Sequence, residues 1–254
     1  MKTQDMRTYS SKTQNKKAEI KFFDRFDKGR GYDVFEPSGY EKVARYMKDE
    51  IPNKKGLLIY DMGCGSGAFT FYIAKAYRGS KVIGMDISTG CIRKARKDYP
   101  FIEFSVGDVE ATGLKSNSVD VVCYTGIFHH FADFSKVAQE AHRILKPGGR
   151  IFSYDPNFFN PAFWLYRDKR SLFYSSVGIT SNERLLKAQE IKRVFENSGF
   201  RMKTKIISGI KFSYVESKSA RPLLTIYNFL DQILAASPLA FIIGSFILGF
   251  GKKK

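Results

Sequence analysis

The sequence predicts an α/β protein in which a mostly parallel, doubly wound sheet lies between two layers of helices. Short apolar runs alternate with segments of helical periodicity over residues 57–155, and this alternation is typical of parallel sheets. Several of the apolar runs end in an acid or in a glycine-rich turn. Ligands of such sheets bind outside the carboxyl ends of the strands. At 254 residues the chain is long enough for one such domain with additions.

The first strand is predicted in LLIYDMGCGSGAFT, residues 57–70. Aliphatic and aromatic residues lead into Asp61, and Gly63, Gly65 and Gly67 follow at alternate positions. This pattern indicates a strand, a tight turn and a helix N-terminus. Glycine permits positive φ and lets a ligand lie against bare main chain, and helix N-termini attract negative ligand groups. The turn indicates a nucleotide or cofactor site, and by itself it also satisfies the weak G-x-G-x-x-G/A dinucleotide pattern.

Acids at the ends of the next two strands narrow the choice of cofactor. KVIGMDIST, residues 81–89, places Asp86 about one βαβ step after the glycines, where a carboxylate can accept hydrogen bonds from both ribose hydroxyls. FIEFSVGDVE, residues 101–110, places Asp108 where it can bond the amino group of an adenine. Asp61 would repel a pyrophosphate but not an amino group. A ligand with an ammonium, a ribose and an adenine, and without a diphosphate, fits these three acids.

Five motifs in order make residues 57–155 resemble the class I S-adenosylmethionine-dependent methyltransferases, with a methyltransferase type 11/25-like domain. The motifs are DMGCGSG, MDIS, GDVE, VDVVCYTGIFHHF (119–131) and RILKPGGRIFSYDPN (143–157). The resemblance implies a Rossmann-like α/β/α sandwich whose last strand is antiparallel, and S-adenosyl-L-methionine as the cofactor.

The resemblance also implies roles for single residues. The three glycines would hold the methionine part of the cofactor with Asp61 nearby, Asp86 would take the ribose hydroxyls, Ile87 would lie against the adenine, and Asp108 would bond its amino group. Val109 and Thr125 complete the implied cofactor site.

The remaining elements of the core follow from the same alternation. Residues 1 to about 20 are polar and rich in lysine, and we expect them to be disordered or loosely attached. A helix is expected after Pro37, within an aromatic segment that the resemblance makes a cover of the pocket. Helices are then expected at 68–77, 88–98 and 133–145, and strands at 81–86, 101–105, 119–124 and 150–155. We expect residues 1–55 to form a tail and helical pocket cover, and 56–254 to form the methyltransferase domain.

Beyond Asp155 the pattern changes. Residues 156–176 are too aromatic and too interrupted by proline for a regular element, and we interpret about 156–180 as an insertion that caps the pocket. A helix at 182–198 ends at Gly199, a good C-terminal stop, and the sixth strand follows. A second insertion, at about 218–238, contains a helix at about 221–236.

The apolar run 239–250 has two interpretations. It is predicted to be a buried final strand over 240–250, because it is shorter than the roughly 20 residues that span a bilayer. In the alternative, the apolar segment that begins at Arg221 lies on a membrane interface, helped by the terminal lysines Lys252–Lys254. This second interpretation would suit a lipid or lipid-linked substrate.

Charge indicates which partners the protein can bind, and cysteine content indicates its location. The formal net charge is +17, and most of the excess lies outside the segment 56–156. A basic face favours anionic partners such as a phosphorylated small molecule, an anionic membrane or RNA; the alternative is that the lysines only keep the protein soluble. The three cysteines show no pairing or metal-ligand spacing, which indicates reduced thiols, a cytoplasmic protein and no metal site. The polar N-terminus lacks the apolar core of a signal peptide.

Methyl transfer from a sulfonium requires chiefly that the acceptor be aligned and water be excluded. A base is needed only for a hydroxyl or a protonated amine. His129 and His130 lie just past a strand end and are candidate bases, with structural packing as the alternative. Asp155 ends the next strand, where it lines the acceptor pocket or fixes the turn.

The leading hypothesis is a methyltransferase acting on an O or N atom of a small-molecule or lipid-linked, anionic acceptor. An RNA methyltransferase, favoured by basicity alone, and a non-catalytic cofactor-binding partner subunit are the alternatives. The sequence leaves the acceptor and the oligomeric state open.

Overall fold

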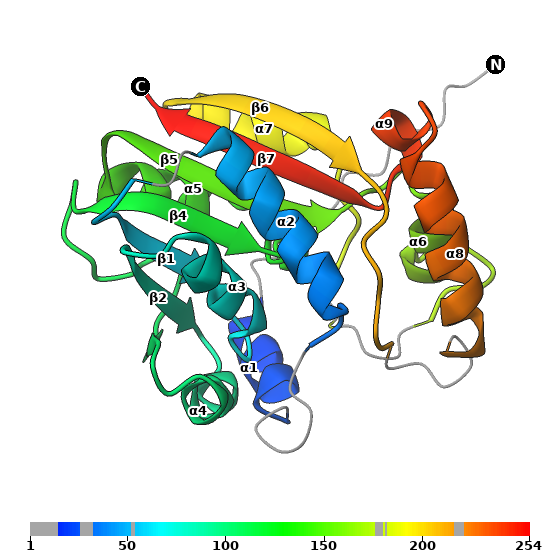
Figure 1. Cartoon of the computed structure of the whole chain (residues 1–254), viewed down its shortest axis with the longest axis horizontal. Helices are drawn as coiled ribbons and strands as arrows, with labels where there is room; N and C mark the ends of the chain where they lie inside the picture. The colour runs from blue at the N-terminus through cyan, green and yellow to red at the C-terminus, as the bar shows by residue number, and fades with distance from the viewer. Residues whose placement is uncertain (1–14, 26–32, 52–53, 176–179, 181, 216–220) are drawn as a thin grey trace.

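The computed structural model describes residues 15–25, 33–51, 54–175, 180, 182–215 and 221–254. Its sheet has seven strands in the order β3-β2-β1-β4-β5-β7-β6 (Figure 1). The strands are β1 (Leu58–Met62), β2 (Lys81–Asp86), β3 (Glu103–Val106), β4 (Val119–Thr125), β5 (Leu145–Pro156), β6 (Phe200–Ile207) and β7 (Phe246–Lys253). β7 pairs antiparallel with β5 and β6, and the other neighbours are parallel. The predicted fold class, including the antiparallel last strand, is confirmed.

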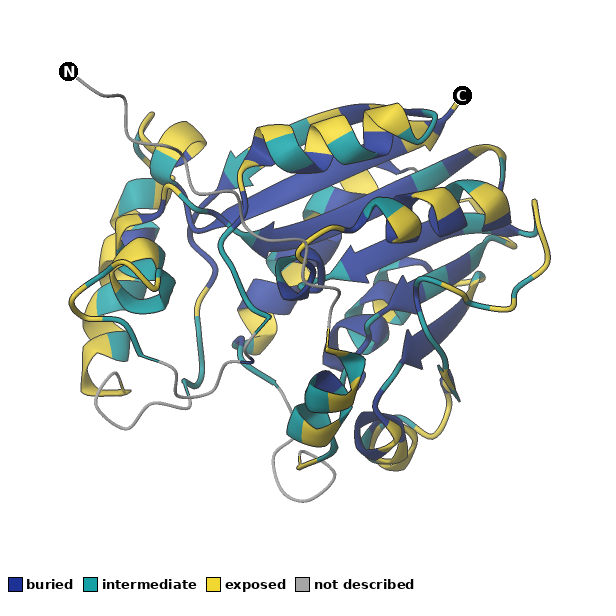
Figure 2. Cartoon of the chain, turned by 180° about the vertical axis from the view of Figure 1, so that it is seen from behind, coloured by how far each residue is buried: buried dark blue, intermediate teal, exposed yellow. Residues whose placement is uncertain are grey.

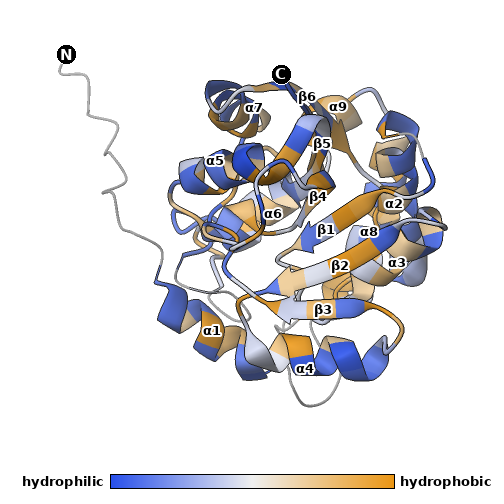
Figure 3. Ribbon diagram, turned by 90° about the vertical axis from the view of Figure 1, so that its left-hand side faces the viewer, coloured by the Kyte–Doolittle hydropathy of each residue, from blue (hydrophilic) through white to orange (hydrophobic). Residues whose placement is uncertain are grey.

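Helices cover both faces of this sheet, as Figure 3 shows with the strands in the middle. They are α1 (Lys16–Asp24), α2 (Pro37–Glu50), α3 (Ala68–Ala76), α4 (Thr89–Asp98), α5 (Ser135–Ile144), α6 (Pro161–Arg167), α7 (Ala188–Asn197), α8 (Leu224–Ala235) and α9 (Ala240–Ile243), with short 3-10 turns η2 (Phe128–His130) and η3 (Arg221–Leu223). α2 and α3 pack on one face through residues such as Met47 and Ile73. α5 and α7 pack on the other through residues such as Val137 and Phe195.

The strand order reverses between β1 and β4. In open α/β sheets a crevice forms at such a point, outside the carboxyl ends of the strands. The glycine-rich turn follows β1, and the two adjacent histidines follow β4 in η2. The topology therefore brings these two motifs to the same edge of the sheet.

The N-terminal segment departs from the prediction. Residues 16–20, which we expected to be disordered or loosely attached, form the first half of α1; residues 1–14 lie outside the described part. Asp24 at the end of α1 accepts hydrogen bonds from Ser88 Oγ at 2.7 Å and Gly90 N at 2.8 Å. These partners lie more than sixty residues away in sequence, so composition alone gave no sign that the segment is anchored.

Three predicted elements of the C-terminal half are also corrected. Residues 161–167, within the segment predicted to lack regular structure, form α6: Pro161 occupies a first-turn position and Asn160 caps the helix by accepting from Phe163 N. The helix predicted at 182–198 begins only at Ala188. The chain before it is held by Arg184 N donating to His129 O and Phe158 N donating to Leu186 O.

The apolar run 239–250 is divided between two elements. Residues 240–243 form α9, and the buried final strand, β7, covers 246–253 instead of 240–250. Gly244 ends the helix, and a Cβ there would lie 2.5 Å from Ala240 O. The helix predicted at about 221–236 is confirmed as η3 and α8. Among the residues that the structure describes, no helix has the length and hydropathy needed to cross a membrane.

Candidate functional site at the carboxyl edge of the sheet

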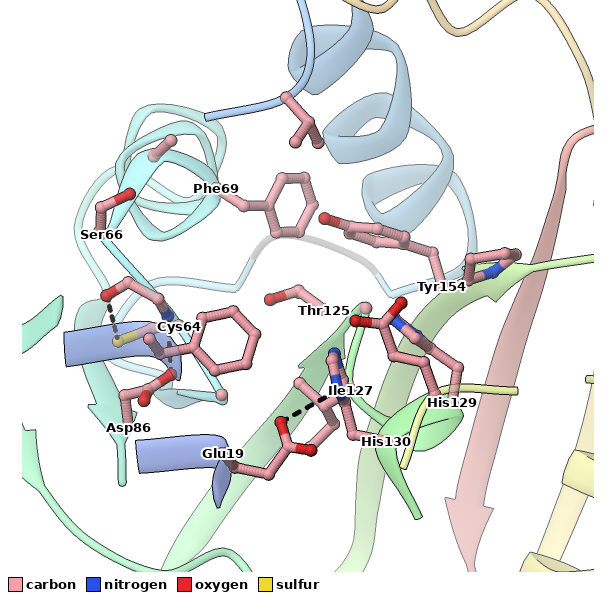
Figure 4. Close-up of a pocket in the computed structure, with 18 of the residues that line it drawn as sticks. Glu19, Cys64, Ser66, Phe69, Asp86, Thr125, Ile127, His129, His130 and Tyr154 are labelled. Atoms are coloured by element: carbon pink, nitrogen blue, oxygen red, sulfur yellow. Dashed lines mark hydrogen bonds and ion pairs between the residues drawn. The ribbon is translucent and has the colours of Figure 1, made fainter. Parts of the chain in front are cut away.

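A single pocket of about 270 Å³ runs along the carboxyl ends of the strands (Figure 4). One end, here called the glycine end, is lined by Gly63, Gly65, Ser66, Asp86, Ile87, Asp108 and Val109. The other, here called the histidine end, is lined by Glu19, His129, His130, Tyr154, Phe163, Arg167, Glu183, Arg184, Phe212 and Tyr214. Thr125 lines the pocket between the two ends, and Phe35 and Tyr40 of the N-terminal cover line it as well.

The three glycines of the turn have different surroundings. All have positive φ, at +76° for Gly63, +52° for Gly65 and +86° for Gly67. A Cβ on Gly63 would lie 2.2 Å from Ile127 Cγ2, whereas a Cβ on Gly65 would meet no atom within 4 Å. Gly67 packs against the Phe104 ring and is not among the pocket-lining residues. The bare main chain at Gly65 is therefore the part of the turn that a ligand can approach most closely.

Asp61 lies behind the pocket. Its side chain is fully buried and accepts hydrogen bonds from Thr70 Oγ1 at 2.7 Å and Thr125 Oγ1 at 2.8 Å. Burial raises the pKa of Asp61 to about 6, against the two threonine hydrogen bonds, which lower it. The Asp61 carboxylate thus contacts Thr125, which does line the pocket. Asp61 can therefore affect a ligand through the position of the Thr125 hydroxyl.

Asp86 occupies the end of β2 and faces the pocket (Figure 4). Its Oδ2 accepts from Gly65 N at 2.9 Å and its Oδ1 from Ser88 N at 2.8 Å. These bonds tie the carboxylate to the glycine turn and to the start of α4. Burial raises the pKa of Asp86. A carboxylate has about four lone-pair sites, so Asp86 retains acceptor capacity for hydroxyl groups of a ligand.

Asp108 and Val109 follow β3 at the same end of the pocket. Asp108 Oδ1 accepts from Glu110 N at 3.0 Å, and its Oδ2 pairs with Lys16 Nζ of α1 at 2.5 Å. α1 therefore reaches across the glycine end. Lys16 was not predicted as a site residue, because it lies in the segment expected to be loosely attached.

His129 forms a buried pair with Asp155. The Nδ1 atom of His129 lies 2.8 Å from Asp155 Oδ1, which also accepts from His129 N at 3.1 Å. Asp155 is fully buried and is not among the pocket-lining residues, so it holds the imidazole from behind. Burial lowers the pKa of His129 well below its ordinary value and raises the pKa of Asp155 to about 8. Below about pH 8 the Asp155 carboxyl is therefore protonated. The pair must lose this proton before His129 can accept one from a substrate.

His130 is paired with a carboxylate from α1. Its Nδ1 lies 3.2 Å from Glu19 Oε2, as the dashed line in Figure 4 marks. Burial alone would lower the pKa of His130, but the hydrogen bond that its ring N–H donates to Glu19 raises the pKa above its ordinary value. The centroids of the two histidine rings are 4.2 Å apart. The two adjacent histidines thus differ in charge, because His130 holds its proton while the field of that cation further lowers the pKa of His129.

Sequence reasoning missed Glu19 as a site residue. It is 3% exposed, and it also accepts a hydrogen bond from Asn182 Nδ2 at 2.5 Å. The run KKAEIKFF after Asn15 is a helix-start signal that indicates α1. Periodicity does not show that this helix lies against a histidine more than one hundred residues away.

The far wall of the histidine end is aromatic and basic. Phe163 and Arg167 come from α6, and Phe212 and Tyr214 come from the chain after β6. Arg184 lines the same wall and pairs with Glu190. These residues suit a ligand that combines apolar surface with negative charge.

Cysteine and metal chemistry receive no support from the described residues. Burial raises the pKa of the Cys64 thiol well above its ordinary value, so this residue in the turn packs and does not act as a nucleophile. The part of the chain that the structure describes holds no group of three or more His, Cys, Asp or Glu residues placed to bind a metal ion.

Comparison with known proteins agrees with this geometry. Residues 60–153 match the family model described as a methyltransferase domain. A demethylmenaquinone methyltransferase of Chlorobaculum parvum is 33% identical over 114 residues, which are 45% of this chain and 47% of that protein. The chain spans about half the length, or less, of the curated relatives it matches.

Solved structures share the fold at low sequence identity. A phosphoethanolamine N-methyltransferase of Haemonchus contortus, in complex with phosphomonomethylethanolamine and S-adenosylhomocysteine, has a TM-score of 0.61 at 18% identity and covers 99% of this chain and 60% of that one. The [4+2]-cyclase SpnF has a TM-score of 0.59 at 13% identity, and the match covers 93% of this chain and 92% of that one. The second case shows that the fold alone does not fix the reaction. The expected class I S-adenosylmethionine-dependent methyltransferase domain and its cofactor, S-adenosylmethionine, are confirmed by the family match and the fold together.

Proposed function

We propose that this class I methyltransferase domain transfers the methyl group of S-adenosylmethionine to an O or N atom of a small-molecule or lipid-linked, anionic acceptor. The observation that carries the proposal is the single pocket that joins Asp86 and the glycine turn to the His129–Asp155 pair. A donor bound at the glycine end and an acceptor bound at the histidine end would share this pocket. Alignment in such a space supplies much of the rate enhancement of a two-substrate reaction.

The glycine end supplies the groups that the cofactor needs. In the proposal, Asp86 accepts hydrogen bonds from the ribose hydroxyls while its own bonds to Gly65 and Ser88 keep it in place. Ile87 and Val109 provide apolar contact for the adenine, and Asp108 bonds its amino group. The open main chain at Gly65 admits the methionine part. When bound, the cofactor supplies a methyl group on a sulfonium, which is already an activated leaving group.

The histidine end supplies proton transfer and charge. In the proposal, His129 accepts a proton from the acceptor at Nε2, because Nδ1 is held by Asp155. Asp155 is thus a positioning residue, which fixes the ring and stabilises the imidazolium that forms. His130, kept cationic by Glu19, stabilises negative charge on the acceptor.

The far wall and the names of the relatives support the proposed acceptor class. Phe163, Phe212 and Tyr214 offer apolar contact, and Arg167 offers positive charge. The relatives named above carry names that refer to a quinone and to a phosphorylated amine. Both are small molecules, and they support a small-molecule or lipid-linked acceptor here.

The proposal is tested by transfer of labelled methyl groups from the cofactor into a cell extract that is then separated into lipid, small-molecule and RNA fractions. Label in the lipid or small-molecule fraction, lost with His129→Asn, is the expected result. Label confined to RNA would overturn the proposed acceptor class. Tight cofactor binding without label in any fraction would indicate a non-catalytic partner subunit.

A further inference from the structure

α8 buries Asp231 and partly buries Asn228, while most of its apolar residues face outward. Its exposed apolar residues, with the residue before it, are Leu223, Ile226, Phe229, Leu230 and Ile233, each between 55% and 64% exposed. The spacing of three and four residues places them on one face of the helix. Figure 2 shows exposed positions along α8 and α9.

Buried polar contacts fix this rotation of the helix. Asp231 is 3% exposed, and its carboxylate accepts from Gly209 N at 2.6 Å and from Ser245 Oγ. Asn228 Oδ1 accepts from Phe212 N at 3.0 Å, and Asn228 Nδ2 donates to Phe212 O at 2.8 Å. A buried polar group that loses such a partner costs about 1–3 kcal/mol. The helix therefore cannot rotate its apolar side inward without breaking these bonds.

The exposed apolar surface continues into α9. Leu239, Phe241 and Ile242 are between 56% and 66% exposed. Between Pro222 and Ile242 every exposed residue is apolar except Thr225. We call the exposed apolar residues of 223–242 the apolar face. Contiguous exposed apolar surface of this kind usually marks an interaction site.

The charge around the apolar face points to the partner. Lys211 and Arg221 are exposed and lie beside α8. Lys211 precedes Phe212, whose main chain bonds Asn228 of α8, and Arg221 is the first residue of η3, which leads into α8. Among the described residues of 208–245 the one acid is Asp231, and it is buried within the protein. Within the described part of 208–245 the exposed charges are thus all positive. An apolar surface with a basic border is complementary to an anionic lipid surface.

A lipid surface also fits the chemistry of the apolar face better than a protein does. Interfaces between proteins carry about one hydrogen bond per 100–200 Å², and the exposed side chains from 222 to 242 offer only Thr225 for that purpose. A bilayer needs no such bonds, because apolar side chains enter the acyl region directly.

The apolar face belongs to the part of the molecule that walls the histidine end. Phe212 and Tyr214, which line the pocket, immediately precede the α8 region, and Phe163, which also lines it, stacks on Tyr227 of α8 with ring centroids 6.1 Å apart. We propose that the apolar face docks on an anionic lipid bilayer, with Lys211 and Arg221 contacting the headgroups. This inference goes beyond the proposed function and does not depend on which acceptor is methylated.

The test is flotation of the full chain with vesicles of phosphatidylcholine alone or with added phosphatidylglycerol. We expect binding to the anionic vesicles that weakens with salt. The double variant Ile226→Gln/Phe229→Gln should bind at least ~10-fold more weakly, because two apolar side chains no longer leave water. Lys211→Glu/Arg221→Glu should remove the preference for anionic lipid.

Phe101→Gln is the matched control, since Phe101 is 70% exposed but lies just before β3. It should bind vesicles like the unaltered chain. Calorimetry with S-adenosylhomocysteine checks that each variant remains folded. Equal vesicle binding by the Ile226/Phe229 variant, or no binding by the unaltered chain, would overturn the inference. A dimer in gel filtration that this variant dissociates, without vesicle binding, would instead assign the apolar face to a second copy.

Discussion

The glycine end of the pocket is built from turns that directly follow β1, β2 and β3, whereas the histidine end gathers residues from α1, η2, α6 and the chain after β6. At the glycine end each residue predicted from the sequence belongs to a local motif, and only Lys16, which pairs with Asp108, comes from a distant segment. At the histidine end the pairs His130–Glu19 and His129–Asp155 join residues 111 and 26 positions apart. The position of the glycine end is set by the ends of neighbouring strands, whereas the histidine end depends on how distant segments pack.

If the two ends have separate roles, His129→Asn should produce the largest effect, on the rate alone. We expect kcat to fall by roughly 10²–10⁴, the usual contribution of a general base, while S-adenosylhomocysteine affinity stays unchanged. His142→Asn is the matched control, because His142 lies on α5 and is not among the pocket-lining residues. A kcat within twofold of the unaltered chain would remove His129 from the chemistry.

The complementary change, Asp86→Ala, should act on cofactor affinity. Loss of two hydrogen bonds to a charged group, each about 1.5 kcal/mol or more, predicts binding weaker by roughly 100-fold. Calorimetry with S-adenosylhomocysteine measures it. Asp98→Ala is a suitable control, since Asp98 is exposed on α4 and, among the described residues, forms an ion pair with Lys94 alone. Unchanged affinity in Asp86→Ala would disconnect this carboxylate from the cofactor.

Glu19→Gln tests the bridge from α1 to the histidine end. Breaking this buried ion pair should lower the free energy of unfolding by about 3–5 kcal/mol near pH 6. The folded pKa of His130 is raised above 6.5 and that of Glu19 is lowered below 4.5. The stabilisation is therefore complete between these values, and it is lost as pH rises through the raised pKa of His130. Denaturant unfolding of both proteins at pH 6 and pH 9 checks this; an equal deficit at both values would contradict it.

The smallest predicted effect is the pH dependence of kcat. Because the pKa of Asp155 is raised to about 8, the His129–Asp155 pair must lose its extra proton before it can act as a base. The rate at pH 7 should be about a tenth of the plateau, which is approached only above about pH 9, following the deprotonated fraction. Asp155→Asn should abolish this step and lower the plateau. A flat profile in the unaltered chain would show that transfer needs no base.

The same contrast explains what the sequence could predict. The order of the strands and the positions of Gly63, Asp86 and Asp108 followed from apolar runs that end in turns, since strand ends in a parallel sheet meet at one edge. Glu19 and Lys16 were missed because their partners are remote in sequence. Asp61 and Gly67 were placed in the predicted site, yet one bonds Thr70 and Thr125 and the other packs on Phe104.

Composition also gave a wrong prediction of burial in the C-terminal segment, where burial depends on packing. The apolar run 239–250 was predicted as one buried strand, but β7 is buried between β5 and β6 while α9 is exposed. Both halves are equally apolar in sequence. Only the position of Gly244, and the contacts of Asp231 and Asn228 that orient α8, decide which apolar residues face outward.

The most direct test of the two-ended pocket is a crystal structure of the full chain with S-adenosylhomocysteine. We expect the ribose hydroxyls within hydrogen-bond distance of Asp86, the adenine against Ile87 and Val109, and the sulfur directed toward the histidine end. A cofactor bound elsewhere, or one whose sulfur points away from His129, would contradict it.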